Sequence, residues 1–236
     1  MNVILFGATG MVGQDVLREC LRSDAVARVL VVGRTPVGVR HPKLREIVRP
    51  DVSDLDGLGD ELDGYHACFF CLGVSSVGMN EDAYRAVTHD LTLAVARAVS
   101  ARNPGLVLTY VSGAGTDSSG QGRTMWARVK GRTENDLLAL DVDGYMFRPG
   151  YIQPGPGTVS KTRLYRVVYR IVSPVAPLLR RLFPNQVTSG DRIGRAMLAV
   201  AVPGAGGRVP ANRILGTREI NALGGPPGPE GRDDRG

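Results

Sequence analysis

Three glycines early in the chain have a spacing that suits phosphate binding. The stretch Gly7-Ala-Thr-Gly-Met-Val-Gly13 directly follows the apolar run Val3-Ile-Leu-Phe6. In a turn from strand to helix, backbone N–H groups and the positive end of the helix dipole face a bound anion. Gly7 permits a tight turn, Gly10 lets a pyrophosphate approach the backbone, and Gly13 lets the helix pack close to the strand. We expect a dinucleotide to contact Gly7, Thr9, Gly10, Met11, Val12 and Gly13, the alternative being a purely structural turn.

The residue after the second expected strand bears on which dinucleotide binds. NAD sites commonly place Asp or Glu there, where the carboxylate accepts a hydrogen bond from the ribose 2′-OH. This chain instead has Arg34, which would pair with a 2′-phosphate through bidentate, charge-assisted hydrogen bonds. We therefore predict NADP rather than NAD as the cofactor, with a merely solvated Arg34 as the alternative. Asp51 and Val52, just after the third strand, are expected to meet the adenine.

Alternating apolar runs and helix-like stretches must position these residues. Strands are predicted at Val3–Phe6, Arg28–Val32, Leu44–Val48, Ala67–Leu72, Leu106–Val111 and Tyr145–Phe147, and helices at Met11–Leu21, Glu81–Ala101 and Arg123–Leu140. Mostly unbroken apolar strands that alternate with helices indicate a parallel sheet covered on both faces. The predicted fold class is α/β, a Rossmann-type doubly wound parallel sheet with a small, mostly helical C-terminal cap.

The composition changes after Pro149, where glycine and proline become frequent. We predict an NADP-binding Rossmann domain over residues 1–150 and a C-terminal cap or substrate region over 151–223, folded onto the same domain. Helical segments are expected in the cap at about 161–172, 175–183 and 190–202. The Gly- and Pro-rich residues 224–236 are expected to form a disordered tail.

Together these motifs resemble the atypical, extended-like branch of the short-chain dehydrogenase/reductase superfamily, which includes NAD(P)-binding epimerase- and dehydratase-like proteins. The resemblance covers nearly all of residues 1–150 and rests on Gly7–Gly13, Gly33-Arg34, Asp51-Val52, Cys71-Leu-Gly73, Val111-Ser112, Lys130 and Phe147-Arg-Pro-Gly150. Within that branch the chain is similar to the Tat-interacting-protein group and its bacterial relatives. The resemblance implies further cofactor contacts from Cys71, Leu72, Gly73, Lys130, Arg148, Pro149 and Gly150.

The resemblance also implies a catalytic tyrosine four residues before the lysine, but Trp126 stands at that position. The indole N–H donates a hydrogen bond and offers no usable proton. Trp126 is therefore expected to orient a carbonyl or to wall the pocket, and Lys130 to hold the nicotinamide ribose.

Two further side chains are candidates for work on the substrate. Ser112 would orient the substrate oxygen, the alternative being a hydrogen bond at the end of its strand; the loop hydroxyls Thr116, Ser118 and Ser119 are other candidates. Tyr151 is the candidate proton donor, with packing as its alternative, and Tyr84 and Tyr110 are less well placed.

The cysteines and histidines do not indicate redox or metal chemistry. In an extended strand Cys68 and Cys71 would lie about 10 Å apart and point to opposite faces, so structural thiols are expected. His41, His66 and His89 lack a partner at metal-ligand spacing, so we predict no metal site.

The net charge of +6 comes mainly from scattered arginines. We therefore expect a small-molecule substrate and no nucleic-acid partner. The basic residues of 161–183 could contact a membrane surface or a lipid-like substrate, the alternative being the solvated edge of a cap, and a homodimer is left open. With no bilayer-spanning run and no signal peptide, we expect a cytoplasmic protein.

The sequence thus predicts an NADP(H)-binding oxidoreductase or epimerase of the short-chain dehydrogenase/reductase type, acting on a small carbonyl or alcohol. The alternative is a weakly active or inactive binding or scaffold protein that senses NADP.

Overall fold

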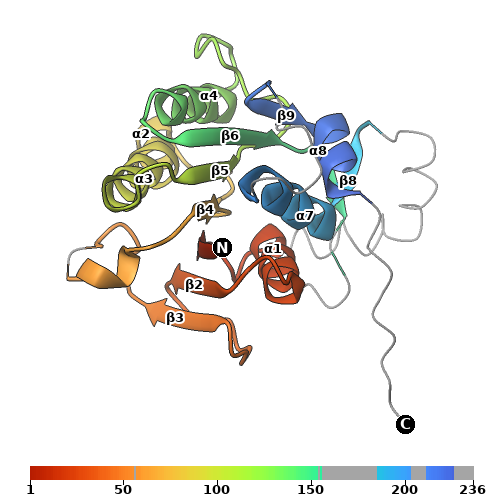
Figure 1. The fold of residues 1–236 in the computed structure, drawn as a ribbon. Helices are drawn as coiled ribbons and strands as arrows, with labels where there is room; N and C mark the ends of the chain where they lie inside the picture. Colours follow the sequence, from red (N-terminus) through yellow and green to blue (C-terminus); the bar gives the residue numbers. More distant parts are fainter. Residues whose placement is uncertain (56, 154, 156–184, 203–210, 226–236) are drawn as a thin grey trace.

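The computed structural model describes residues 1–55, 57–153, 155, 185–202 and 211–225 (Figure 1). Its strands are β1 (Asn2–Phe6), β2 (Arg28–Gly33), β3 (Leu44–Val48), β4 (Ala67–Phe70), β5 (Val107–Val111), β6 (Asp143–Arg148), β7 (Tyr151–Gln153), β8 (Val187–Ser189) and β9 (Ile214–Gly216). Its helices are α1 (Met11–Arg22), the 3-10 helix η1 (Gly59–Leu62), α2 (Glu81–Arg85), the π-helical η2 (Ala86–Asp90), α3 (Leu91–Arg102), α4 (Met125–Leu138), α7 (Gly190–Ala201) and α8 (Thr217–Gly224).

Seven parallel strands form the main sheet, in the order β3-β2-β1-β4-β5-β6-β9. The chain winds outward from β1 in one direction and from β4 in the other, so the order reverses between these two neighbours. Ligands of open α/β sheets bind at such a reversal, beyond the carboxyl ends of the strands. The predicted doubly wound Rossmann-type sheet is confirmed.

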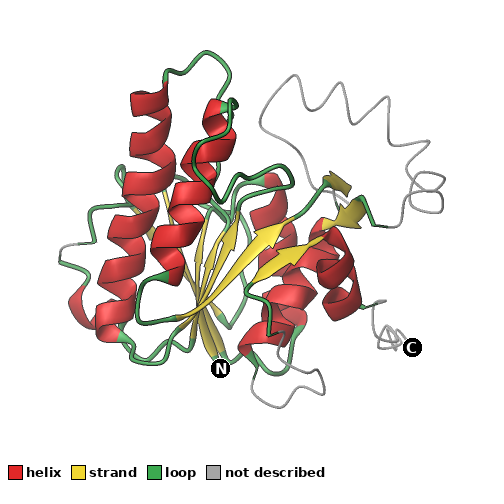
Figure 2. Cartoon of the chain, turned by 90° about the horizontal axis from the view of Figure 1, so that it is seen from above, coloured by secondary structure: helices red, strands yellow, loops and turns green. Residues whose placement is uncertain are grey.

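Helices cover both faces of the sheet, with α1, α7 and α8 on one face and α2, α3 and α4 on the other (Figures 1 and 2). Successive strand residues point to opposite faces. Val3 and Leu5 of β1 therefore join the core beneath α1 and α7, whereas Ile4 and Phe6 join the core beneath α3. This two-sided burial explains why β1, β2 and β4 are mostly unbroken apolar runs, whereas the edge strand β3 contains Arg45 and Glu46 and is only partly buried.

The predicted elements of residues 1–150 are present with small shifts at their ends. The strand expected to reach Leu72 ends at Phe70, and the single helix expected over Glu81–Ala101 is divided into α2, η2 and α3. Within η2 the Leu91 N–H bonds to the carbonyl of Ala86, five residues back, which is the pairing of a π turn. Neither feature has a signature in residue periodicity.

The C-terminal third contains strands that the sequence analysis did not expect. β9 pairs with β6 as the seventh strand of the main sheet, and β7 pairs with β8 in a separate two-stranded sheet. The helix expected at 190–202 is confirmed as α7. The expected helices at 161–172 and 175–183, and residues 226–236 of the expected tail, lie outside the described residues.

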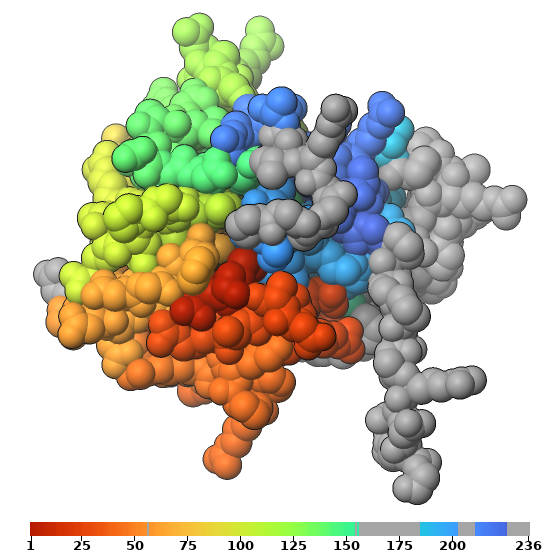
Figure 3. Space-filling view, viewed as in Figure 1, coloured from red at the N-terminus to blue at the C-terminus, as the bar shows by residue number. Residues whose placement is uncertain are grey.

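The first and last parts of the chain pack together where α1 meets α7 (Figure 3). Gly194 allows a close approach, since a Cβ atom there would lie 3.0 Å from the Glu19 side chain. Glu19 is buried, and its Oε2 lies 3.4 Å from Nη1 of Arg195 in α7, which makes an ion pair. Asp15 is fully buried and accepts a hydrogen bond of 3.0 Å from the Gly155 N–H. Two carboxylates of α1 thus tie it to residues at least 140 positions later in the chain.

Candidate functional site

The glycine turn after β1 has the geometry expected from its sequence. Gly7 has φ +83°, and a Cβ atom there would lie 2.6 Å from the backbone of Cys71 and Leu72. At Gly13 a Cβ atom would lie 2.1 Å from the Gly7 carbonyl oxygen. Gly7 therefore makes the turn and Gly13 brings α1 close to it, as predicted. At Gly10 the nearest atom would be 3.2 Å away, so this position is tight, and its pyrophosphate contact stays a prediction.

The N-terminus of α1 lies at the reversal point of the sheet and has no side-chain cap. Its N-cap residue is Gly10, and its first turn contains no acidic residue. The N-terminus of α2 differs: Asn80 accepts a 2.8 Å hydrogen bond from Ala83 N–H, and two acidic residues follow in the first turn. The first N–H groups of a helix have no partner within the helix and attract anions. The start of α1 is thus suited to a phosphate group, and Thr9, Met11 and Val12 beside it are half-buried.

The other predicted cofactor residues on this side follow the neighbouring strands. Arg34 comes directly after β2 and is exposed. Asp51 follows β3 and accepts hydrogen bonds from the Ser53 hydroxyl at 2.7 Å and the Ser53 N–H at 2.9 Å, which hold the Asp51 pKa below its usual range. Val52 is buried. The half-buried Cys71 and Leu72 and the exposed Gly73 follow β4. All lie at the same edge of the parallel sheet as the glycine turn.

Lys130 extends from α4 to the end of β5. Its ammonium group donates a hydrogen bond to the carbonyl oxygen of Ser112. Burial of the ammonium group lowers the pKa of Lys130 to about 8, while the negative charge of Glu134 acts in the opposite direction. The structure therefore brings two of the predicted site residues into contact.

Ser112 is buried, and its hydroxyl donates to the carboxylate of Glu134. The same oxygen lies 3.1 Å from the Phe147 carbonyl oxygen. A serine hydroxyl has a single proton to donate, and here that proton is directed to Glu134. This contact favours the structural alternative for Ser112 over a direct role in orienting substrate.

Glu134 is a central residue that the sequence analysis missed. It is fully buried and pairs with Arg148, whose Nε lies 3.0 and 3.1 Å from the two carboxylate oxygens. Arg148 also donates to the Ser118 hydroxyl at 2.5 Å. The Arg148 guanidinium thus forms an internal ion pair, and its expected contact with the cofactor stays a prediction. The available signal was spacing, because residues four apart lie on one helix face and Glu134 follows Lys130 at that distance.

Trp126 lies against the loop that follows β5. A Cβ atom at Gly115, which has φ +85°, would be 3.3 Å from the Trp126 ring. The ring thus covers the loop one helical turn before Lys130, and the two expected roles of Trp126, orienting a carbonyl or walling the pocket, stay predictions. Two of the candidate loop hydroxyls have partners within the loop: Thr116 donates to the Gly113 carbonyl at 2.8 Å, and Ser119 donates to Asp117 at 2.7 Å. The third, Ser118, accepts from Arg148 of β6.

The loop itself sits directly on α4 at Gly131. A Cβ atom there would lie 1.7 Å from the carbonyl oxygen of Asp117, which no side chain could occupy without moving the loop. Asp117 in turn accepts a hydrogen bond of 2.6 Å from Gly122 N–H. The chain after β5 is thus held against the helix that carries Trp126 and Lys130.

Tyr151 lies in β7, beyond the turn that ends β6. Its N–H donates to the Gln186 carbonyl at 2.9 Å, and the preceding residue, Gly150, donates to the Thr217 hydroxyl at 2.8 Å. Burial raises the pKa of Tyr151, which makes it a weaker acid near neutral pH. Tyr84 and Tyr110 are buried, and burial raises the pKa of Tyr110 as well.

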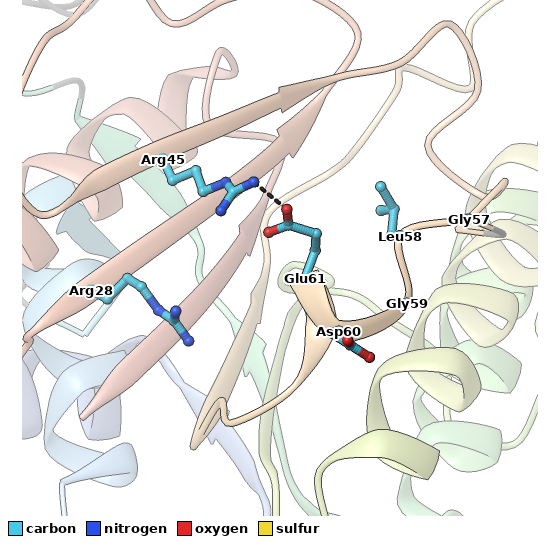
Figure 4. A pocket seen from close by; sticks show the side chains of 7 residues that line it. All are labelled: Arg28, Arg45, Gly57, Leu58, Gly59, Asp60 and Glu61. Carbon is cyan, nitrogen blue, oxygen red and sulfur yellow. Dashed lines mark hydrogen bonds and ion pairs between the residues drawn. The ribbon is translucent and has the colours of Figure 1, made fainter.

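A wide groove of about 570 Å³ lies elsewhere, between the start of β2 and η1 (Figure 4). It is lined by Arg28, Arg45, Gly57, Leu58, Gly59, Asp60 and Glu61. Arg45 and Glu61 form an ion pair across it. Arg28 is the first residue of β2, and Arg45 pairs with Leu30 in the first half of that strand, so the groove lies towards the opposite end of the strands from the glycine turn.

The three cysteines are free thiols, and burial raises the pKa of Cys68 to about 12. Within the described ranges, no group of three or more His, Cys, Asp or Glu side chains could hold a metal ion.

Solved structures share this fold at low sequence identity. An oxidoreductase of the short-chain dehydrogenase/reductase family from Burkholderia thailandensis has a TM-score of 0.61 and 17% identity, covering 86% of each chain. The Bordetella bronchiseptica enzyme WbmF, solved with NAD+, has a TM-score of 0.60 and 16% identity, covering 86% of this chain and 70% of that one. MoeE5, solved with UDP-glucose and NAD, has a TM-score of 0.61 and 18% identity, covering 95% and 81%. The fold is that of the short-chain dehydrogenase/reductase class, as expected.

Curated relatives match nearly the whole chain. The mitochondrial protein fmp52 of Aspergillus fumigatus is 30% identical over 238 residues, covering 95% of this chain and 98% of that protein. The namesake from Aspergillus clavatus is 32% identical over 223 residues, covering 89% and 91%. The chain therefore belongs to the Fmp52 family. No protein-family model matches it.

The relatives contradict the expected cytoplasmic location. The related proteins from Aspergillus fumigatus, Aspergillus clavatus and Eremothecium gossypii are all named mitochondrial. The expectation was wrong because it used apolar runs and the lack of a secretory signal, and neither feature reports on a mitochondrial location. No helix within the described ranges is long and apolar enough to span a bilayer.

Proposed function

We propose that this protein is an NADP(H)-dependent oxidoreductase or epimerase-like enzyme acting on a small carbonyl or alcohol. The observation that carries the proposal is the uncapped N-terminus of α1, which follows a turn of glycines at the reversal point of the sheet. Proteins of this fold have been solved in complex with NAD+, NADH or NAD. When bound, such a dinucleotide supplies or accepts a hydride.

The preference for NADP is proposed from Arg34. The side chain is exposed directly after β2, the strand beside β1. Its fixed positive charge favours the 2′-phosphate that distinguishes NADP from NAD.

We assign separate roles to the side chains beside β5. Lys130 binds the nicotinamide ribose of the dinucleotide through its ammonium group, and Trp126 forms a wall of the site. Arg148 and Ser112 support the site from within, because both bond to the buried Glu134. The resemblance to the Tat-interacting-protein group is proposed on the sequence motifs alone.

The test is dinucleotide affinity in a pair of variants at Gly10. Gly10→Asp and Gly10→Asn add side chains of nearly equal size, and both residues are good N-caps. Only aspartate brings a negative charge to the helix N-terminus. Isothermal titration should therefore show much weaker NADP+ binding by Gly10→Asp than by Gly10→Asn. Equal affinities, or no uptake of NADP+ or NAD+ by folded wild-type protein, would refute the proposal.

The alternative function is a dinucleotide-binding sensor or scaffold with little turnover. Trp126 favours it, since the usual phenol is absent. The alternative predicts tight dinucleotide binding without hydride transfer to any of a panel of carbonyls.

A further inference from the structure

A carbonyl reduction at this site needs a proton donor, and few side chains beside β5 and α4 can supply one. Trp126 offers no usable proton, and an arginine such as Arg148 does not deprotonate in proteins. The carboxylate of Glu134 is fully buried and already binds Arg148 and the Ser112 hydroxyl. Burial makes the Tyr151 phenol a weaker acid. Tyr110 of β5 is buried, which raises its pKa, and Asp136 of α4 is exposed and bonded to His89. Lys130 is therefore the titratable group that remains at the end of β5.

Lys130 has the position and the bonding that proton transfer requires. It lies one helical turn after Trp126 on the same face of α4, and the residue is partly buried, so solvent can reach it. An ammonium group has three N–H donors. Among the described residues its hydrogen bond is to the Ser112 carbonyl oxygen. That bond fixes the group at the end of β5 and leaves donors for a ligand.

We propose that Lys130 itself transfers the proton in this protein, its ammonium group donating to a substrate carbonyl oxygen in place of the phenol that Trp126 has replaced. The inference rests on the proposed function, because the nicotinamide dinucleotide is the reductant. The carbonyl carbon gains a hydride and its oxygen gains a proton from Lys130. The C=O double bond becomes a C–O single bond, and the neutral amine then takes a proton from water. In the oxidative direction the neutral amine accepts the proton of the hydroxyl group.

The charged groups around Lys130 suit this role. Burial without a counter-charge would drive the Lys130 pKa down further, and Glu134 on the same helix limits that fall. Arg148, from β6, neutralises part of the Glu134 charge. The resulting pKa of about 8 is near the working pH, where a group can both give and take a proton.

The first test measures the pKa of Lys130 in the protein without cofactor. Competitive acetylation with acetic anhydride, quantified by mass spectrometry across pH, should show Lys130 becoming reactive with a midpoint near pH 8, with Lys43 as the internal reference. A midpoint above about pH 10, the ordinary range for lysine, would overturn the proposal. Failure of Lys130 to react at any pH would also overturn it, because a sealed amine could not regain a proton from water.

The second test separates charge from proton transfer. Lys130→Arg keeps a cation that can donate to the Ser112 carbonyl but cannot release a proton. We expect dinucleotide affinity to change by only a few fold and carbonyl reduction to fall by about 100-fold or more. Trp126→Tyr in the Lys130→Arg background should restore part of the rate by returning a phenol to the site. Lys43→Arg, far from β5, is the matched control.

The outcomes distinguish this inference from the proposed function. If Lys130→Arg reduces carbonyls as fast as wild type, Lys130 is not the proton donor, although the oxidoreductase assignment stands. If wild-type protein binds dinucleotide tightly but reduces no carbonyl, both proposals fail and the sensor function remains.

Discussion

Glu134 offers the sharpest test of the structure, through the substitution Glu134→Gln. Glutamine preserves size and can still hydrogen-bond Ser112, but it removes the charge that Arg148 faces at 3.0 and 3.1 Å. Breaking a buried ion pair by removing one partner costs about 3–5 kcal/mol because the other charge stays buried. The Arg148 side chain is 20% exposed and can gain some hydration, so we expect about 3 kcal/mol, the lower end of that range.

The assay is equilibrium unfolding in urea, supported by thermal melts. For a chain of this size, a loss of about 3 kcal/mol corresponds to a decrease in Tm of about 6–12 °C. The matched control is Glu61→Gln, the same substitution in the exposed Arg45–Glu61 pair. It should cost no more than about 1 kcal/mol. If both variants lose equal stability, or if Glu134→Gln loses less than about 1 kcal/mol, the buried ion pair does not hold β6 to α4.

Three further predictions address the cofactor, the lysine and the loop. Arg34→Ala should weaken NADP+ binding at least about 10-fold more than NAD+ binding, because a charge-assisted phosphate contact is lost. Equal losses by titration calorimetry would contradict the assigned 2′-phosphate contact. Burial lowers the pKa of Lys130 from 10.5 to about 8 in the folded protein, so between these pH values the unfolded chain binds more protons and the free energy of unfolding rises with pH. Urea unfolding of Lys130→Met should lack that rise, and an unchanged pH dependence would count against the lowered pKa. Gly131→Ala should destabilise by about 1–3 kcal/mol or more, since its methyl group overlaps the Asp117 carbonyl; a Tm equal to wild type would show that the loop does not rest on α4.

Sequence reasoning succeeded where one residue type answers a local geometric need. Gly7 and Gly13 could be interpreted this way because a turn with positive φ and a close backbone approach both exclude side chains. The central strands of residues 1–150 were predictable for a similar reason, since burial on both faces leaves a mostly unbroken apolar run.

Sequence reasoning failed where a residue's role depends on contacts far along the chain. β7, β8 and β9 have three residues each, too few for an alternating pattern to show. Glu134 resembles any helical glutamate until β6 brings Arg148 against it. Likewise, nothing in the sequence indicated that the Arg148 guanidinium would pair with this carboxylate.

The contact between α1 and α7 has a consequence for how the protein is made. The apolar face of α1 emerges from the ribosome near the start of synthesis, but its covering helix ends at Ala201 and the last strand of the sheet at Gly216. Contacts so distant in sequence close slowly, and exposed apolar surface promotes aggregation in the interval. We expect the nascent chain to depend on chaperones until translation is nearly complete, and a nonsense mutation before Gly190 to yield an insoluble product.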